Sequence, residues 1–238
     1  MTLTQTHPDV VRFHGHECPG ASLGARIADA AVRRLGRHAP GNELIAIGEI
    51  DSCALDAVQV IAGCTFGKRN LVHRDHGKNV FTFWRKADGA AVRVSARPGS
   101  DAYRDERTWE LAEKVEAGTA DDAEKALFAR LQAQRIERIL TVDEDALLLV
   151  QDVDDAVPSV KSLRPHEACE ECGDQTSVSV LHNHRGRMLC PPCHLGAHGG
   201  ELPADHGHGH HGHGHGHGHH GHDHSHPRAH AHAHGHGS

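Results

Sequence analysis

The sequence has 238 residues and a formal net charge of -7 with neutral histidines, and from Asp205 onward it is almost entirely His, Gly and Ala. Roughly 200 residues remain to build hydrophobic cores, which suits one domain of moderate size and a small one. Asp205, Asp223 and Arg228 contribute -1, so the preceding residues carry -6. An acidic body argues against a general nucleic-acid-binding protein.

The distribution of apolar residues and cysteines indicates a compartment. The sequence contains no stretch of 18 apolar residues, and its first thirty residues contain no apolar run behind a basic start. We therefore expect a soluble, cytoplasmic protein with no membrane partner. Four of the seven cysteines form two Cys-x-x-Cys pairs, which is typical of metal ligation in a reducing compartment rather than of a disulfide framework.

The first chemical signal is the segment 13–20, Phe-His-Gly-His-Glu-Cys-Pro-Gly, which places two imidazoles and a thiol within five residues. Its glycines and proline predict a loop rather than the interior of a helix or strand. His16 and Cys18 offer nitrogen and sulfur, the donors that zinc, nickel and cobalt prefer. The alternative is a buried cysteine in a Gly-Pro turn beside surface histidines.

Residues 21–38 predict an amphipathic helix, because apolar side chains recur every four residues and arginines, including Arg26, occupy the other faces. Pro40 and Gly41 end it. The positive end of the helix dipole then follows Cys18 directly and favours a thiolate, which a metal ligand and a nucleophile both require.

A second sulfur follows the next predicted strand. Residues 43–50 are apolar and alternate, which predicts a buried strand, and residues 53–62 predict a helix that begins at Cys53. We group Cys53 with His16 and Cys18 as three ligands of one ion. A site with three protein ligands and an open position is catalytic or exchangeable rather than structural.

The segment 63–70 predicts a glycine-rich turn. Cys64 lies eleven residues after Cys53, roughly 16 Å along a helix, so we assign it a separate role. The turn lacks the spacing of a phosphate-binding Walker loop, and Arg69 stands where that loop has Ser or Thr. Lys68 could still bind an anion, and the alternative is a simple loop.

The clearest hairpin comprises residues 79–85 and 91–97, which alternate around a turn at 87–90. Two helices and a strand are expected further along, at residues 105–118, 120–140 and 146–153. The fold class is therefore α+β, with a small, mainly antiparallel sheet packed by helices. We place this core domain at residues 1–155 and a linker at 156–164.

The strongest local signal is a pair of Cys-x-x-Cys motifs separated by 17 residues, formed by Cys169, Cys172, Cys190 and Cys193. This spacing predicts a zinc ribbon or treble-clef-like module, which we place at residues 165–198. Four thiolates close the coordination sphere, so the zinc is structural, because about thirty residues cannot bury enough apolar surface to fold alone. We expect His182, His184 and His194 to be surface residues rather than ligands.

The C-terminal residues 199–238 hold 16 of the 27 histidines and nothing apolar beyond Ala and Pro after Leu202, so we expect a disordered tail. Neutral imidazoles match nickel, zinc, cobalt and copper, which predicts that the tail buffers and hands over ions. The alternatives are an expression tag, against which the irregular spacing argues, and neutral low-complexity sequence. The assigned tail ligands are His206, His208, His210, His211, His213, His215, His217, His219, His220, His222, His224 and His226.

Three motifs in chain order carry a family resemblance. They are Phe13-His14-Gly15-His16-x-Cys18-Pro19-Gly20 with Gly24; Asp51-x-Cys53-x-x-Asp56-Ala57-x-Gln59; and Gly63-Cys64-Thr65-x-Gly67-Lys68-x-Asn70-Leu71. With Phe81-x-Phe83 and Val92-Arg93-Val94, they resemble the FmdE family of formylmethanofuran dehydrogenase proteins over residues 10 to about 155. Residues 165–195 are similar to the zinc module of many members.

The resemblance implies an α+β core that forms a homodimer and has a groove, lined by cysteine and histidine, that can hold a metal. His16, Cys18 and Cys53 are the matching positions. Many relatives occur outside methane metabolism, so the resemblance does not fix a reaction. The His-rich tail departs from the family pattern and favours metal handling.

Two hypotheses follow, and whether the chain is an enzyme stays open between them. In the first, the protein binds zinc structurally and exchanges a second divalent metal, Zn, Ni or Co, between groove and tail. In the second, it is a metal-dependent enzyme, or an accessory protein of a molybdenum or tungsten formylmethanofuran or formate-type dehydrogenase. Cys18 or Cys53 is then the catalytic thiolate, and Lys68 steers an anion. A weaker alternative makes the zinc module a regulatory or nucleic-acid-binding element, against which the acidic body argues.

Overall fold

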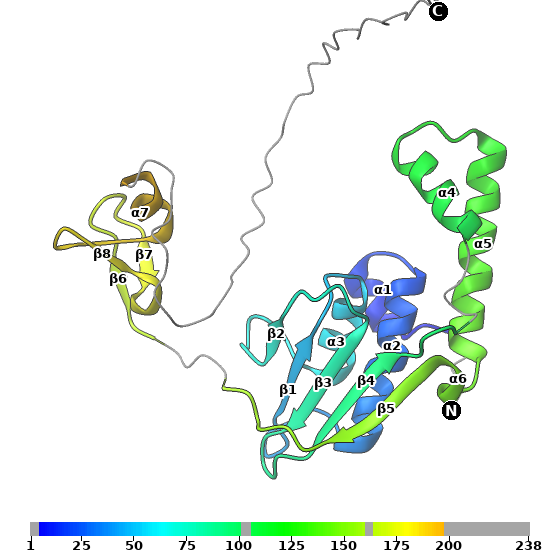
Figure 1. Cartoon of the computed structure of the whole chain (residues 1–238), viewed down its shortest axis with the longest axis horizontal. Helices are drawn as coiled ribbons and strands as arrows, with labels where there is room; N and C mark the ends of the chain where they lie inside the picture. Colours follow the sequence, from blue (N-terminus) through cyan, green and yellow to red (C-terminus); the bar gives the residue numbers. More distant parts are fainter. Residues whose placement is uncertain (1–4, 101–105, 160–163, 198–238) are drawn as a thin grey trace, which may run out of the picture. The chain divides into compact units, whose positions relative to one another are not determined.

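The computed structural model describes residues 5–100, 106–159 and 164–197. The chain divides into two compact units, Met1–Ser162 and Leu163–Ser238 (Figure 1). The division falls inside the stretch 156–164 that the sequence predicts as a linker. No helix among the described residues has the length and apolar character needed to cross a membrane.

The first unit alternates helices and strands before it ends in a helical hairpin and a last strand. Its helices are α1 (Pro8–His14), α2 (Pro19–Leu35), α3 (Ala54–Ala62), α4 (Glu106–Glu116), α5 (Asp122–Thr141) and α6 (Glu144–Leu147). Its strands are β1 (Leu44–Gly48), β2 (Leu71–His73), β3 (Val80–Arg85), β4 (Ala91–Ala96) and β5 (Leu148–Val153). The α+β class expected from the sequence is confirmed.

The five strands form one sheet in the order β2-β1-β3-β4-β5. Only β1 and β2 are parallel, and the other pairs are antiparallel, as expected of a mainly antiparallel sheet. The predicted hairpin is present as β3 and β4, with Phe81 opposite Val94. The sequence did not predict β2, because three residues are too few to show an alternating pattern.

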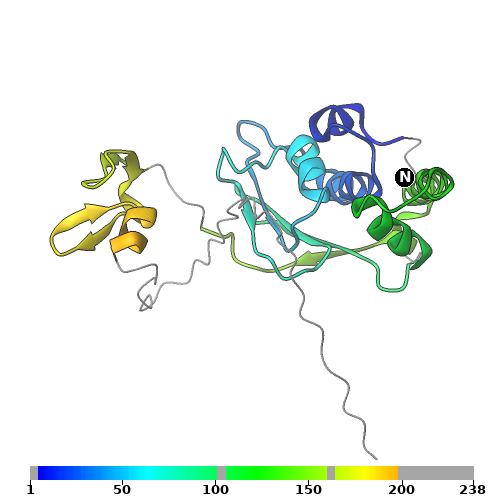
Figure 2. The ribbon, with the colours of Figure 1, turned by 90° about the horizontal axis from the view of Figure 1, so that it is seen from above.

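The helices α1, α2 and α3 cover one face of the sheet (Figure 2). Alternation along β3 divides its side chains between the two faces. Phe81 and Phe83 join the main core beneath the helices, whereas Trp84 packs with Ile47 in a smaller cluster. The Nε1 of Trp84 donates to the carbonyl of Asp155, 3.0 Å away, so the chain just before the predicted linker is held against β3.

Helix α2 is the centre of the core, and its small residues let α3 approach closely. A Cβ added at Gly24 would lie 2.5 Å from the Cα and the carbonyl oxygen of Ala54, the first residue of α3. The two backbones therefore touch at this point, which only a glycine permits. This contact holds the start of α3 against the first turns of α2, where Cys18 and Gly20 lie.

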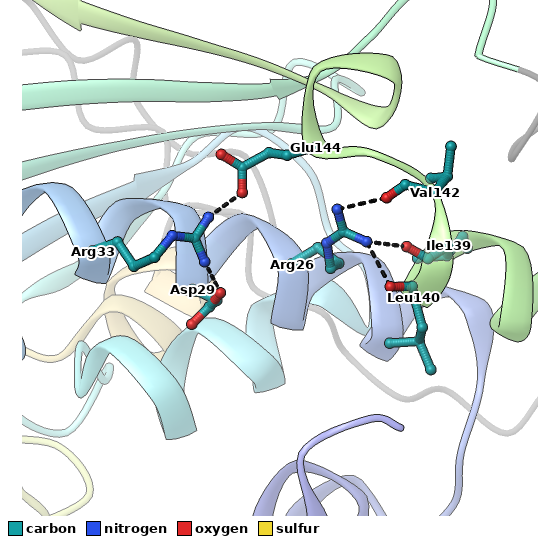
Figure 3. Close-up of polar contacts among 7 residues, drawn as sticks. All are labelled: Arg26, Asp29, Arg33, Ile139, Leu140, Val142 and Glu144. Carbon is teal, nitrogen blue, oxygen red and sulfur yellow. Dashed lines mark hydrogen bonds and ion pairs between the residues drawn. The ribbon is translucent and has the colours of Figure 1, made fainter. Parts of the chain in front are cut away.

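Arg26 joins α2 to the end of α5 (Figure 3). Its side chain is 1% exposed, although the helix pattern placed it away from the apolar face. One terminal nitrogen donates to the carbonyls of Ile139 and Leu140 and the other to that of Val142, at 2.8 to 2.9 Å. The last carbonyls of a helix have no intrahelical partner, so the buried guanidinium supplies one. Arg33 bonds Asp29 and Glu144 at the surface.

The second unit is small and irregular. Its elements are β6 (His166–Ala168), β7 (Gln175–Ser177), a 3-10 turn η1 (Val178–Val180), β8 (His182–His184), β9 (Arg187–Leu189) and α7 (Pro191–Ala197). Strands β6 and β7 form one antiparallel pair, and β8 and β9 form another. The turn between β8 and β9 carries Arg185 and Gly186 at positive φ, within the expected hairpin. The buried centre consists of Cys169, Leu189 and Cys190.

Candidate metal centres

The loop between α1 and α2 gathers three metal-ligating side chains. Helix α1 ends at His14, where Gly15 takes a left-handed conformation with φ 90, and α2 begins at Pro19. This short connection between two helix ends brings His14, His16 and Cys18 together. Each offers one ligand atom, and these atoms all lie within 4.8 Å of one another. One ion could contact all three.

Cys18 is the N-cap of α2 and therefore lies at the positive end of a 17-residue helix. Its Sγ accepts a hydrogen bond from the backbone N–H of Ala21, 3.4 Å away. A backbone donor and the helix dipole both stabilise negative charge on sulfur. The position therefore suits an anionic metal ligand or nucleophile, as the helix predicted after Cys18 implied.

His14 is held from the other side by a carboxylate. Its Nδ1 lies 2.8 Å from Oδ2 of Asp56 on α3, and its Nε2 lies 3.5 Å from Sγ of Cys18. The side chain of His14 is 12% exposed and that of Asp56 is 33% exposed, so the pair is partly shielded from water. The rings of His14 and His16 lie 4.5 Å apart between centroids.

Cys53 lies directly before α3 and borders this cluster. A Cβ added at Gly20 would be 3.6 Å from Sγ of Cys53 and 4.0 Å from Sγ of Cys18, so the bare glycine backbone lies against both sulfurs. Burial raises the pKa of Cys53 to about 11, and the neighbouring Cys18 contributes to the rise by its charge and a hydrogen bond. A bound cation would offset both effects. We use the name N-terminal site for His14, His16, Cys18 and Cys53.

The structure thus brings the predicted residues His16, Cys18 and Cys53 into one region, and it adds a residue that sequence reasoning omitted from the ligand set. His14 belongs to the three-donor group, whereas Cys53 lies beside it. The signal for His14 was its position two residues before His16 and four residues before Cys18. Its partner Asp56 lies 42 residues away, and no local pattern reveals that contact.

Lys68 and Cys64 are not brought to the N-terminal site. Both follow the C-terminal end of α3, whereas Cys53 precedes its first residue. The Nζ of Lys68 donates to the carbonyl of Gly63 at that end of the helix. Cys64 is fully buried, and burial raises the pKa of its thiol to about 12.

The second unit contains the four-thiol cluster expected from the sequence. The sulfurs of Cys169, Cys172, Cys190 and Cys193 all lie within 4.8 Å of one another, so the cluster could hold a metal ion and is consistent with zinc. The backbone N–H of Cys190 donates to Sγ of Cys169 at 3.2 Å. Within the described residues, this is one of two groups of three or more metal-binding side chains, and the N-terminal site contains the other.

Hydrogen bonds distribute the protons unevenly among the four thiols. Backbone N–H donors from Cys190 and Cys172 lower the pKa of Cys169 to about 6. The pKa of Cys193 is raised to about 12, first by its hydrogen bond to Cys190 and then by burial. Four thiolates repel one another at this distance unless a cation neutralises them, which is what a zinc ion does in such a cluster.

The expectation that three nearby histidines lie at the surface is wrong for His194. This side chain is 5% exposed and stacks on His182, with ring centroids 4.5 Å apart and an interplanar angle of 12°. His184 meets it edge-on at 5.9 Å. The unit has so few large apolar residues that imidazoles fill its interior. The predicted tail ligands lie outside the described residues.

Comparison with known proteins places the first unit in a family. The model of the family described as "FmdE, Molybdenum formylmethanofuran dehydrogenase operon" matches residues 13–149. That range includes the N-terminal site and ends before the four-cysteine cluster. The chain is also 31% identical over 175 residues to a "Probable S-adenosyl-L-methionine-binding protein" of Archaeoglobus fulgidus. The match covers 68% of this chain and 46% of that protein, so the chain spans about half the length of this curated relative.

A solved structure shares the fold. The crystal structure of an FmdE-like protein of tungsten formylmethanofuran dehydrogenase from Syntrophus aciditrophicus matches with a TM-score of 0.54 and 24% identity. The match covers 79% of this chain and 89% of that chain. Since the family model spans more than half of the sequence and includes all four residues of the N-terminal site, the chain belongs to the FmdE family.

Proposed function

We propose that this chain handles a divalent transition metal, zinc, nickel or cobalt, at the N-terminal site. The supporting observation is the convergence of two imidazoles and one thiol within 4.8 Å, with a second thiol alongside. Nitrogen and sulfur donors favour these ions over magnesium or calcium. Three donors leave a coordination position free, so the ion can exchange.

The tail supplies the exchange partner in this proposal. Its sixteen imidazoles offer many weak and interchangeable ligands, and their tether keeps them at high local concentration near the folded units. The four-cysteine cluster takes no part in exchange, because four thiolates around zinc leave no open position. Zinc there stabilises the second unit.

Elemental analysis of protein purified without a metal-affinity column tests the proposal. After equilibration with nickel or zinc and desalting, the intact chain retains several ions per chain. A chain without residues 205–238 retains about two, one in the four-cysteine cluster and one in the N-terminal site. Equal metal content in the two chains removes the buffering role of the tail.

Variants of the truncated chain test the N-terminal site separately. Replacing His14, His16 and Cys18 together by alanine lowers the retained metal by one ion, and replacing Cys64 by alanine serves as the matched control with no effect. An unchanged metal content in the triple variant contradicts the proposed site.

A second function is favoured by the description of the family model, which names a molybdenum formylmethanofuran dehydrogenase operon. In that case the protein is an accessory protein or a metal-dependent enzyme acting on one-carbon or formyl substrates beside a molybdenum or tungsten dehydrogenase, with Cys18 or Cys53 as thiolate. Lys68 has no part in it, because its amine bonds Gly63 at the far end of α3. Affinity purification from the native cell followed by molybdenum and tungsten analysis tests this function, and a preparation free of both metals contradicts it.

We also propose a cytoplasmic homodimer, in keeping with the family resemblance. Light scattering after size-exclusion chromatography gives twice the chain mass of 25.7 kDa if this is correct. A single-chain mass at micromolar concentration contradicts the dimer.

A further inference from the structure

Asp56 is the one acidic side chain that the described contacts connect to the three-donor group. It lies in the first turn of α3, and its Oδ2 accepts from Nδ1 of His14 at 2.8 Å, across from the end of α1. Its other oxygen, Oδ1, accepts from Nε2 of Gln59 one turn further along α3, at 3.3 Å. Both carboxylate oxygens are therefore engaged, which fixes the orientation of the carboxylate.

This contact decides which nitrogen of His14 faces the ion. An ionised carboxylate only accepts hydrogen bonds, so the nitrogen beside it, Nδ1, carries the proton of the neutral ring. The lone pair then lies on Nε2, which is the nitrogen 3.5 Å from Sγ of Cys18. A histidine that donates one N–H to a carboxylate and ligates a metal through the other nitrogen is a recurring arrangement in metal proteins.

His16 lacks such support. It is exposed, and among the described contacts it makes a ring contact with His14 but no hydrogen bond. The two imidazoles of the N-terminal site therefore differ. One is shielded and oriented by α3, whereas the other is free to turn toward solvent.

We infer that Asp56 is a positioning residue of the N-terminal site, and that it makes His14 the anchoring imidazole while His16 is the exchangeable one. This inference rests on the proposed function. Asp56 fixes the tautomer and the ring orientation of His14 and makes Nε2 a more basic ligand. His16 then releases and recaptures the ion on the solvent side without loss of the His14 and Cys18 contacts.

The test is a cobalt titration of the full-length chain whose four-cysteine cluster has first been filled with zinc. Absorption from thiolate-to-cobalt charge transfer reports the N-terminal site alone, because the histidine tail contains no sulfur. We expect D56A to weaken cobalt binding by about 10- to 100-fold, the usual effect of removing a carboxylate that supports a ligating histidine. D56N keeps an oxygen that accepts from Nδ1, so its loss is smaller. D88A removes a carboxylate from the β3–β4 turn and leaves the affinity unchanged.

The same titration separates the anchoring imidazole from the exchangeable one. H14A loses more cobalt affinity than H16A, because only His14 is held in a ligating orientation before the ion arrives. The D56A substitution weakens binding further in H16A but not in H14A, since Asp56 acts through His14. Equal losses in H14A and H16A overturn the division between the two imidazoles.

Two further outcomes separate the role of Asp56 from the metal site. Equal affinities of D56A and the unsubstituted chain overturn the role of Asp56 and leave the proposed metal site standing. A D56A variant that lowers the unfolding midpoint but not the cobalt affinity shows a purely structural ion pair and has the same meaning. Absence of the sulfur–cobalt band in the unsubstituted chain overturns the metal site itself, and the role of Asp56 with it.

Discussion

At the level of single residues, the cysteines of the first unit differ in their surroundings rather than in their chemistry. Cys18 is partly exposed at a helix N-terminus and accepts a backbone hydrogen bond, whereas Cys64 is fully enclosed by the main core. Burial raises the pKa of Cys64 to about 12, so its thiol stays neutral where Cys18 is prepared as a ligand. Cys64 is therefore a packing residue in this account.

The raised pKa of Cys64 predicts a loss of stability at high pH. The folded chain holds this proton more tightly than the unfolded chain, whose thiol titrates near 9. The stabilisation is complete below pH 9 and is lost as the pH rises toward about 12. Urea unfolding at about pH 8 and about pH 10.5 should therefore show a smaller decline for C64A than for the unsubstituted chain. Equal declines contradict a buried neutral thiol.

Sequence reasoning succeeded at the residue scale where ligands are close in sequence or follow a recognisable element. His16 and Cys18 share a loop, and Cys53 follows a predicted strand. Asp56 was missed as a partner of His14 because the contact joins α1 to α3, and Arg26 was placed at the surface because its partners are the last carbonyls of α5, 113 to 116 residues away. Such contacts exist only after the helices have packed.

Arg26 provides a prediction at this scale. R26M keeps a long side chain but leaves the carbonyls of Ile139, Leu140 and Val142 without their charged donor (Figure 3). Because these groups are buried, we expect the free energy of unfolding to fall by about 3 kcal/mol. R33M, two turns along the same helix, removes half-exposed ion pairs and should cost less than about 1 kcal/mol. Similar losses in denaturant melts of the two variants would refute the helix-end role of Arg26.

At the level of elements, the close crossing of α2 and α3 decides whether the N-terminal site exists. The two helices carry Cys18 and Cys53 at their N-terminal ends, and Gly24 against Ala54 sets their separation. Most elements were predictable, because amphipathic helices and a hairpin have local patterns. The crossing itself was not, since a glycine within a helix has no pattern that distinguishes a close contact from an open surface.

Gly24 tests this crossing. G24A places a methyl group 2.5 Å from the backbone of Ala54, so the helices must separate, at a cost of about 1 to 3 kcal/mol. The separation also moves Cys53 away from Cys18 and weakens cobalt binding. G67A is the matched control, because a Cβ there meets no heavy atom within 4 Å. Wild-type stability and cobalt affinity in G24A would show that the crossing does not govern the site.

At the level of the whole molecule, two units depend on different forces. The first has a continuous apolar core of sheet and helices, whereas the second has three buried core residues, two of them cysteines. The second unit was predictable as a metal module because its ligands have a fixed spacing. Its packed histidine, His194, was not, because only the scarcity of other apolar groups places an imidazole inside.

Metal removal should therefore unfold one unit and spare the other. A chelator strips the four-cysteine cluster, and the second unit loses its fold because too little apolar surface holds it. Amide hydrogen exchange should show lost protection in residues 166–189 and retained protection in β3 and β4. Unchanged exchange in residues 166–189 after complete metal removal would mean that this unit folds without metal.

The central claim is that imidazole and sulfur atoms from α1, α2 and the start of α3 enclose an exchangeable ion. An anomalous difference map from crystals of the intact chain grown with cobalt locates such an ion directly. The account predicts a cobalt peak at bonding distance from Sγ of Cys18 and Nε2 of His14, separate from zinc at the four cysteines. A map with metal at the four cysteines and none beside His14 and Cys18 would contradict it.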